Sequence, residues 1–203
     1  MEKIIFHKET KTFHLYNEEI SYIMCVLENG HMGQLYYGKR IHDKPDFSYL
    51  VEKCGRPMTS YIFEGDRSFS LEHIRQEYPV YGTTDYRHPA IEIMQENGSN
   101  ISEFKYVGYE ILKGKPSLKG LPATYTESEE EAETLKIILK DSLTGAKLTL
   151  LYTIFSKGSA IARSAHICNE GEKVLHLQTM MSLNLDLPDK DYVWMQLSGA
   201  WSR

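Results

Sequence analysis

Histidines and carboxylates are the residues of this chain that could bind a metal or move a proton. The eight histidines show neither H-x-H nor H-E-x-x-H spacing, the patterns that bring two imidazoles to one metal ion. Asp186, Asp189 and Asp191 are close in sequence, but no glycine-containing ligand loop surrounds them, so a charged turn explains them better than a calcium site. The chain contains no G-x-S-x-G elbow and no glycine-rich phosphate loop. We therefore expect no metal or cofactor, and neither acyl transfer nor nucleotide chemistry.

Glycoside hydrolysis needs two opposed carboxylates, and spacing in the sequence does not place such a pair on the two sides of a sugar. Aromatic residues make up 11% of the chain, and Tyr78, Tyr81 and Tyr86 gather near one irregular stretch. Flat rings beside polar groups suit the faces of sugars, but tyrosine is an equally good strand residue. The residues alone therefore nominate no catalytic pair.

Hydrophobic residues alternate with polar ones along much of the chain, which is typical of strands with one buried face. The row of Met181, Leu183, Leu185 and Leu187 is one example. The pattern predicts strands over residues 20–27, 34–37, 135–139, 148–154, 161–167, 174–177 and 181–187. Short turn sequences, Asn29-Gly30 among them, separate consecutive strands. The chain is therefore predicted to be all-β, with one domain over residues 1–203 that forms a large antiparallel β-sandwich, or supersandwich.

Three segments depart from this alternation. Residues 70–78 are predicted to form one short helix, because Ser70 could cap it and Pro79 would end it. Between residues 43 and 69, prolines and glycines interrupt any strand, which predicts a long irregular loop of the kind that often carries function. The acidic run over 127–133 predicts a solvated turn.

Charge and cysteine usage exclude several classes of partner. The net charge is −5, and the Lys and Arg residues are scattered, so we expect no nucleic-acid partner. No apolar stretch approaches the ~20 residues that span a bilayer, and the first residues lack the apolar core of a signal peptide. We expect no membrane association and a cytoplasmic location. Cys25, Cys54 and Cys168 are too few and too far apart for a disulfide framework, and we expect reduced thiols with Cys25 and Cys168 in the core.

The last residues, 197–203, include Trp201 and end on Arg203, without the polar or glycine-rich tail of a finished domain. This pattern predicts that the chain is a piece of a longer protein. Much of the function is then expected to lie outside these residues.

Several blocks of the sequence resemble one enzyme family. They are QEYPVYGTTDYRHPA at 76–90, GKPSLKGLPATY at 114–125 and EAETL at 131–135, with further pieces at 36–40, 163–164 and 197–201. Together they resemble the N-terminal domain of the bacterial α-galactosidases of glycoside hydrolase family 36. The resemblance implies a β-sandwich that precedes a (β/α)8 barrel and a small C-terminal β domain. It also implies an enzyme that releases terminal α-linked galactose, as from melibiose or raffinose, with retention at the anomeric carbon.

In that family both catalytic aspartates belong to the barrel, and no segment here resembles the block that carries the nucleophile. The resemblance therefore implies no catalytic residue in this chain and no activity of the chain alone. It further implies that apolar surface around Trp194 and Trp201 packs against the barrel.

The resemblance also implies a homotetramer in which a loop of the N-terminal domain reaches a neighbouring subunit's active site. The matching loop lies within residues 43–69, and the family's arginine falls on Arg67, which becomes the candidate for binding substrate in trans. Asp66 beside it is a secondary candidate. Some relatives carry an aspartate about a dozen residues earlier, where this chain has residues 52–55, so no residue is assigned to that acidic contact.

Two alternatives remain at this point. Arg67 could instead form a surface ion pair with Asp66 or Glu64. The domain as a whole could be a free-standing carbohydrate-binding or lectin-like module, which would bind sugar by itself, or a purely structural domain, for which Arg67 would be dispensable.

Overall fold

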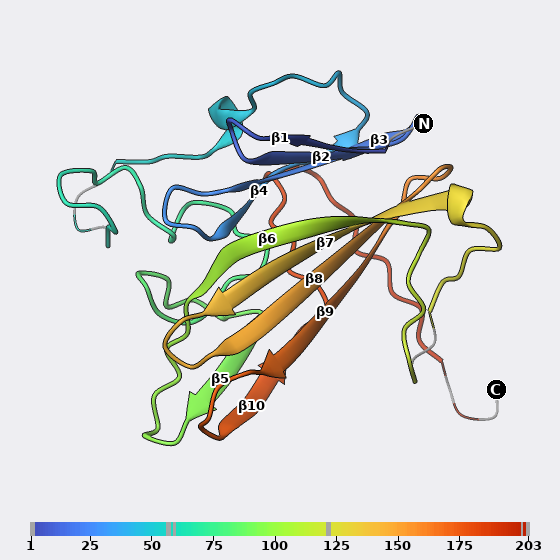
Figure 1. Cartoon of the computed structure of the whole chain (residues 1–203). Coiled ribbons are helices and arrows are strands. Elements are labelled where there is room, and N and C mark those ends of the chain that lie inside the picture. Colours follow the sequence, from blue (N-terminus) through green and yellow to red (C-terminus); the bar gives the residue numbers. More distant parts are fainter. Residues whose placement is uncertain (1–2, 56–57, 59, 121–122, 200, 202–203) are drawn as a thin grey trace.

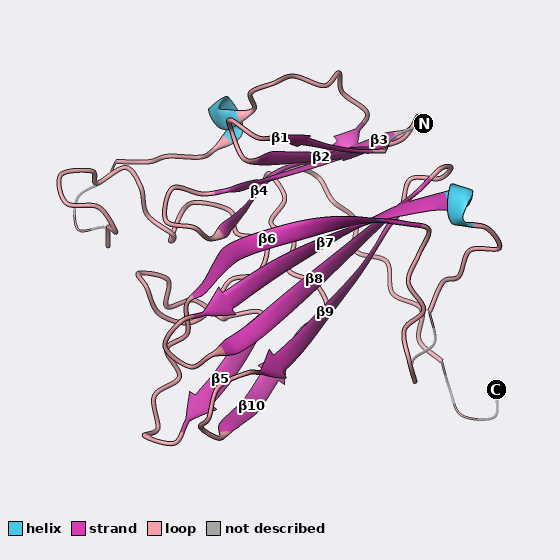
Figure 2. Ribbon diagram, viewed as in Figure 1, coloured by secondary structure: helices cyan, strands magenta, loops and turns pink. Residues whose placement is uncertain are grey.

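The structure, a computed structural model, describes residues 3–55, 58, 60–120, 123–199 and 201. These residues form three antiparallel sheets and two 3-10 helices, without an α-helix (Figure 2). The first sheet contains β1 (Ile4–His7), β2 (Thr12–Tyr16), β3 (Ile20–Val26) and β4 (Met32–Lys39), in that order. The second contains β6 (Phe104–Lys113), β7 (Ala132–Asp141), β8 (Ala146–Phe155) and β9 (Ile161–Asn169). The third pairs β5 (Ile91–Gln95) with β10 (Leu175–Met180), and the helices are η1 (Ser48–Leu50) and η2 (Glu129–Glu131).

The two four-stranded sheets face each other across the main hydrophobic core, so the predicted β-sandwich is confirmed (Figure 1). Alternate residues of each strand point inward, as in any half-buried strand. Tyr22 of β3 and Tyr152 of β8 meet in the middle of this core, with ring centroids 6.0 Å apart. All of the predicted strands up to residue 177 are present, with small differences at their ends, whereas β1, β2, β5 and β6 were not predicted.

The first sheet is covered on its other face as well. Residues 41–55 and 60–74 lie over it, and Phe47, Phe69 and Leu71 from these segments form a second buried cluster with Ile23 of β3 and further residues of the sheet. The predicted irregular loop is therefore real, and its two ends are anchored by burial of apolar side chains.

The prediction of a helix over residues 70–78 is wrong. Only one turn forms there, in which the Ile74 amide donates to the Ser70 carbonyl oxygen at 3.1 Å. Just beyond it, the carbonyl oxygen of Arg75 accepts a hydrogen bond from the amide of Gln34 in β4 at 3.0 Å. The backbone after Arg75 is thus extended, because hydrogen bonding to the edge of β4 replaces the next turn of a helix.

The prediction of a strand over residues 181–187 is also wrong. The segment lies against the sandwich, but side chains bind its backbone in place of a neighbouring strand. Arg163 donates to the carbonyl oxygen of Asn184 at 2.9 Å, and the amide of Asp186 donates to Oε1 of Gln34 at 3.2 Å. Of the alternating row, Leu185 packs against the main core, whereas Met181, Leu183 and Leu187 are exposed, so the alternation here does not mark the buried face of a strand.

Two smaller predictions are confirmed, those for the acidic run and for Cys25. The acidic run forms η2 and the turn before β7, with the glutamates of η2 exposed. Cys25 is buried, but Cys168 is only half-buried, so the prediction of a core position is wrong for Cys168, which lies on the edge strand β9. Neither of the helices in the described residues has the length or the apolar character to cross a membrane.

Candidate functional site

The feature of this fold that could reach another molecule is the segment over residues 43–69, which we call the arm. Its ends are held by the buried rings of Phe47 and Phe69. Between them the described residues run outward from the sandwich, and Figure 1 shows their first part in cyan beyond the edge of the first sheet. Lys53 ties its middle to Glu28 in the turn after β3, with Nζ 2.7 Å from Oε1. The arm is therefore fixed at its base and open to solvent beyond it.

Arg67 lies directly after a tight turn, two residues before the buried ring of Phe69. The turn closes with a hydrogen bond from the Asp66 amide to the Phe63 carbonyl oxygen at 3.2 Å, and Gly65 supplies the φ of +84° that it requires. The carboxylate of Asp66 then accepts hydrogen bonds from the backbone amide and the hydroxyl of Ser68, at 2.8 and 2.6 Å. These bonds lower the pKa of Asp66, so its charge is committed to shaping the turn.

The guanidinium of Arg67 itself is exposed. Among the described residues, neither Asp66 nor Glu64 lies within ion-pair distance of it, which removes the surface ion pair as an explanation for this arginine. A planar guanidinium held out from a rigid turn can donate several hydrogen bonds to a carboxylate or to sugar hydroxyls of another molecule. Arg67 is therefore exposed, whereas the carboxylate of Asp66 is bonded within the turn.

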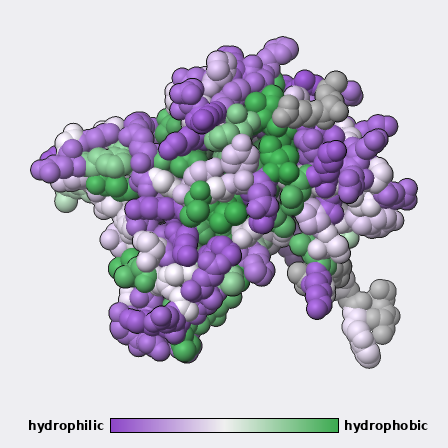
Figure 3. Space-filling view, viewed as in Figure 1, coloured by the Kyte–Doolittle hydropathy of each residue, from purple (hydrophilic) through white to green (hydrophobic). Residues whose placement is uncertain are grey.

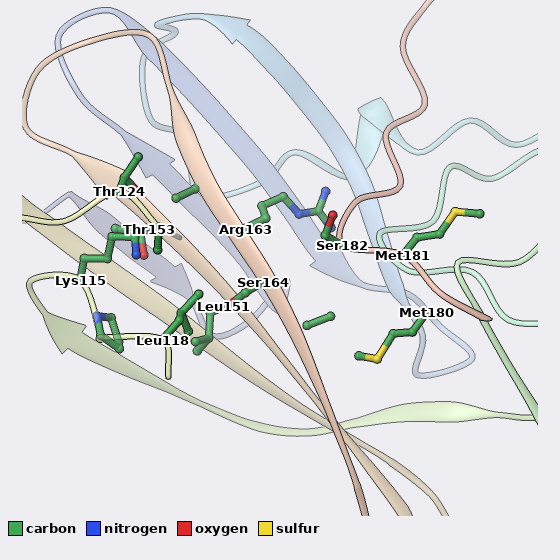
Figure 4. A pocket seen from close by; sticks show the side chains of 14 residues that line it. Lys115, Leu118, Thr124, Leu151, Thr153, Arg163, Ser164, Met180, Met181 and Ser182 are labelled. Atoms are coloured by element: carbon green, nitrogen blue, oxygen red, sulfur yellow. The ribbon is translucent and has the colours of Figure 1, made fainter. Parts of the chain in front are cut away.

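A hollow of about 460 Å³ lies on the outer side of β8 and β9. Lys115 and Leu118 line one side of it, and Met180 and Met181 line the other (Figure 4). None of the described residues that line this hollow is a carboxylate. It therefore lacks the paired acids of a glycoside hydrolase. The described residues also contain no group of three or more His, Cys, Asp or Glu side chains placed to hold a metal ion.

Arg163 belongs to a buried cluster that the sequence analysis missed. Its Nη2 lies 3.2 Å from Oε2 of Glu77, whose side chain is fully buried. The hydroxyls of Tyr22 and Tyr152 donate to the two oxygens of the same carboxylate, at 2.7 and 2.8 Å. Burial raises the pKa of both tyrosines, and the charge of Glu77 raises it further. The sequence contained one signal of this cluster, because Arg163 stands in the row of apolar residues on β9, and a buried cation needs a buried partner.

From this cluster Arg163 also reaches the segment that follows β10. Figure 4 shows its guanidinium directed toward Ser182, and it donates to the carbonyl oxygen of Asn184. The cluster is closed to solvent and fully partnered, so its role is to hold together the two sheets and this segment.

Exposed apolar side chains occur in several parts of the described chain, and two groups of them are prominent. Figure 3 shows one group over β6, where Val107 and Ile111 are 62% and 40% exposed. The other follows β10, where Trp194 and Trp201 are 89% and 96% exposed.

Comparison with known proteins decides the family. The profile of the glycosyl hydrolase family 36 N-terminal domain matches residues 30–203. The chain belongs to this family. The α-galactosidase AgaA of Geobacillus stearothermophilus is 42% identical over 98% of the chain, and Mel36A of Lactobacillus acidophilus is 34% identical over 97%. The chain spans only 27% of the length of each of these relatives.

Solved structures agree with this family 36 assignment. The α-galactosidase of Lactobacillus brevis matches with a TM-score of 0.87 and 38% identity, over 92% of this chain and 25% of that one. The AgaA structure matches with a TM-score of 0.80 and 42% identity, over 85% of this chain and 24% of that one. Variants of AgaA have been solved in complex with raffinose and with stachyose. The chain thus corresponds to about a quarter of each of these solved α-galactosidase structures.

Proposed function

We propose that this chain is the non-catalytic N-terminal domain of an α-galactosidase that releases terminal α-linked galactose, with retention, from sugars of the melibiose and raffinose type. The observation that carries the proposal is 42% identity to AgaA over nearly the whole chain. A variant of AgaA has been crystallised in complex with raffinose, an α-galactoside. The chain spans about a quarter of such relatives, and the carboxylate-free hollow on β8 and β9 supports placing the catalytic aspartates in a downstream barrel.

We further propose that the arm acts on a neighbouring subunit. In a homotetramer, which we expect to assemble in the cytoplasm, Arg67 would enter the active site of an adjacent subunit and donate hydrogen bonds to the substrate or to a carboxylate beside it. The exposure of its guanidinium and the rigid turn behind it support this role. Cofactors are not required, since retaining glycoside hydrolysis uses two carboxylates.

The kinetic test replaces Arg67 in the chain extended through its natural downstream sequence. A hydrogen bond from a charged donor is worth about 1.5–3 kcal/mol, so Arg67→Ala should lower kcat/KM for raffinose by roughly 10- to 100-fold. The matched control is Lys44→Ala, which removes another exposed cation near the base of the arm. Unchanged kinetics in Arg67→Ala would show that the arm does not touch the substrate.

Complementation tests whether the contact is made in trans. Arg67→Ala subunits are refolded together with subunits that keep Arg67 but lack a catalytic aspartate of the barrel. If the arm serves its neighbour, mixed oligomers regain activity, because intact arms enter intact barrels. Activity no greater than that of the Arg67→Ala protein alone would place the contact within one subunit.

A carbohydrate-binding module is the competing function. It is tested by calorimetric titration of the 203-residue chain with melibiose and raffinose. We expect no measurable heat of binding, because the sugar site requires the barrel. Saturable binding by the chain alone would favour the module.

A further inference from the structure

A second group of polar side chains lies at the base of the arm, apart from Arg67. Oδ1 of Asp43, the first residue of the arm, lies 2.9 Å from Nε2 of His7 and 2.7 Å from Nδ1 of His14. On the far side of the His14 ring, Nε2 lies 2.9 Å from Oγ of Ser21. The same hydroxyl oxygen accepts a hydrogen bond from the backbone amide of Ile41, at 3.0 Å, just before the arm begins.

Strand pairing explains why these side chains meet. Ile5 lies opposite His14 in the pairing of β1 with β2, so His7, two residues along β1, is on the same face. Tyr16 lies opposite Ser21 in the pairing of β2 with β3, which places Ser21 on this face as well. The three side chains thus form a diagonal row across β1, β2 and β3, on the face away from the main core.

The order serine, histidine, aspartate is that of a hydrolase triad, but the surroundings exclude nucleophilic attack. Ser21 and His14 are both fully buried. The hydroxyl oxygen of Ser21 already accepts the Ile41 amide, and its proton is directed at His14. A triad serine has to be reached by its substrate and face donors that stabilise an oxyanion. The row is therefore a structural connection between the sheet and the arm.

We propose that Asp43 is a positioning residue, which clamps the base of the arm to the β1–β2 hairpin through His7 and His14 and thereby fixes where Arg67 is presented. The link to Arg67 rests on the proposed function, whereas the clamp itself does not. Further contacts at the same place support it. Thr10 Oγ1, between β1 and β2, donates to the carbonyl oxygen of Pro45 at 3.1 Å. The ring of Phe47 packs edge-on against His14, with centroids 5.6 Å apart.

The proton arrangement of the clamp follows from its partners. Asp43 is a carboxylate, so it can only accept, and each histidine must donate an N–H to it. His14 then carries its proton on Nδ1 when neutral, and its bare Nε2 accepts the proton of Ser21. Both ring nitrogens of His14 and the hydroxyl of Ser21 are satisfied in this state, as a buried polar network requires.

Hydrogen exchange in the 203-residue chain tests the clamp without reference to any activity. The amides of Leu50 and Val51, bonded to Phe47 and Ser48 at 2.9 and 3.0 Å, report on the arm. Because Asp43 supplies a charged acceptor to both histidines, its loss should speed exchange of these two amides by about tenfold or more. Amides in β7, on the other sheet, should keep their rates.

The matched control is Asp46→Ala. This carboxylate lies in the same segment and accepts only from Ser48 among the described residues, with no bond to the hairpin. It is a local change, so exchange at Leu50 should rise less than in Asp43→Ala. Equal rates in Asp43→Ala, Asp46→Ala and the unaltered chain would overturn the clamp.

A second variant keeps the test decisive if Asp43→Ala does not fold. Asp43→Asn retains the shape and an acceptor oxygen but removes the charge, so it should speed exchange by a smaller factor. If Asp43→Asn folds with unchanged exchange in the arm, the clamp is refuted. A graded response, with Asn between Asp and Ala, supports it.

Kinetics of the extended enzyme separate the clamp from a general loss of stability. Asp43→Ala should raise KM for raffinose several-fold and leave kcat within about twofold, because the arm is displaced while the barrel is untouched. Loosened exchange with unchanged KM would mean that the clamp exists but does not position Arg67. If Arg67→Ala itself has no kinetic effect, the proposed function fails, and the exchange data still decide the clamp.

Discussion

Glu77 offers the sharpest test of how the sandwich holds together. Its carboxylate is fully buried between the two sheets and accepts hydrogen bonds from Tyr22 and Tyr152, with Arg163 at 3.2 Å. Glu77→Gln keeps the size of the side chain but removes the negative charge. The guanidinium of Arg163, which is only 9% exposed, then has no counter-charge. Breaking one partner of such a buried pair costs about 3–5 kcal/mol, so we expect that loss in the free energy of unfolding.

The comparison with an exposed pair removes the general effect of charge. Glu103 lies 3.1 Å from Lys105 at the surface, and Glu103→Gln should cost less than about 1 kcal/mol. The stability of both variants is measured by urea unfolding, monitored by circular dichroism and tyrosine fluorescence. Domains of this kind have about 5–15 kcal/mol of total stability, so Glu77→Gln is expected to unfold at a much lower urea concentration.

A double variant tests the physical reason. Replacing Arg163 by Met in the Glu77→Gln background removes the unpaired charge, so the double variant should be more stable than the sum of the two single losses by at least about 1 kcal/mol. A loss below about 1 kcal/mol in Glu77→Gln, or strict additivity in the double variant, would refute the claim that this pair is a coupled buried unit.

Three further predictions concern thiols, pH and the arm. Burial raises the pKa of Cys25 to about 12, and the charge of Glu77 contributes to this shift. Iodoacetamide should therefore label the exposed Cys54 of the native protein and leave Cys25 unmodified until the chain unfolds. Labelling of Cys25 in the native protein would contradict its burial. Burial lowers the pKa of His14 from 6.5, so the unfolded chain binds a proton there more readily, and the free energy of unfolding should fall as the pH drops below about 6.5. His14→Gln should reduce this dependence of stability on pH, as measured by urea unfolding at several pH values. An unchanged dependence would contradict the lowered pKa of His14. Gly65→Ala, at a φ of +84°, should lower the free energy of unfolding by about 1 kcal/mol and loosen the turn before Arg67, whereas Gly55→Ala, at an ordinary φ, should not. Limited proteolysis of the two folded variants compares the mobility of the loop. Equal cleavage of both would argue against strain at residue 65.

Local patterns predicted the sandwich because several of its strands alternate between buried and more exposed residues, β8 among them. The rows of β7 and β8 contain their own evidence for one buried face, and the turn at Asn29-Gly30 needs no distant partner to form. The region over 70–78 has equally good local signals for a helix, but the free edge of β4 competes for its backbone groups. That competition depends on tertiary structure, so no window of sequence could reveal it.

The functional residues were less accessible to pattern reasoning. Arg67 was found through the resemblance to a family, because an exposed arginine in an irregular loop has no periodic signature. The clamp of His7, His14 and Asp43 joins two strands to a loop and depends on register, which alternation alone does not fix. Many strands of this chain can thus be predicted from local sequence patterns, whereas its polar contacts depend on how the strands pair and pack.

The most direct test of the account compares hydrolysis of a chromogenic α-galactoside by the 203-residue chain and by the same chain extended through its natural downstream sequence. We expect activity in the extended protein and none in the chain alone, because the catalytic aspartates are assigned to the barrel. Hydrolysis by the chain alone would contradict it, since that result requires a carboxylate pair within these residues. Inactivity of a well-folded extended protein would contradict the assignment as an α-galactosidase.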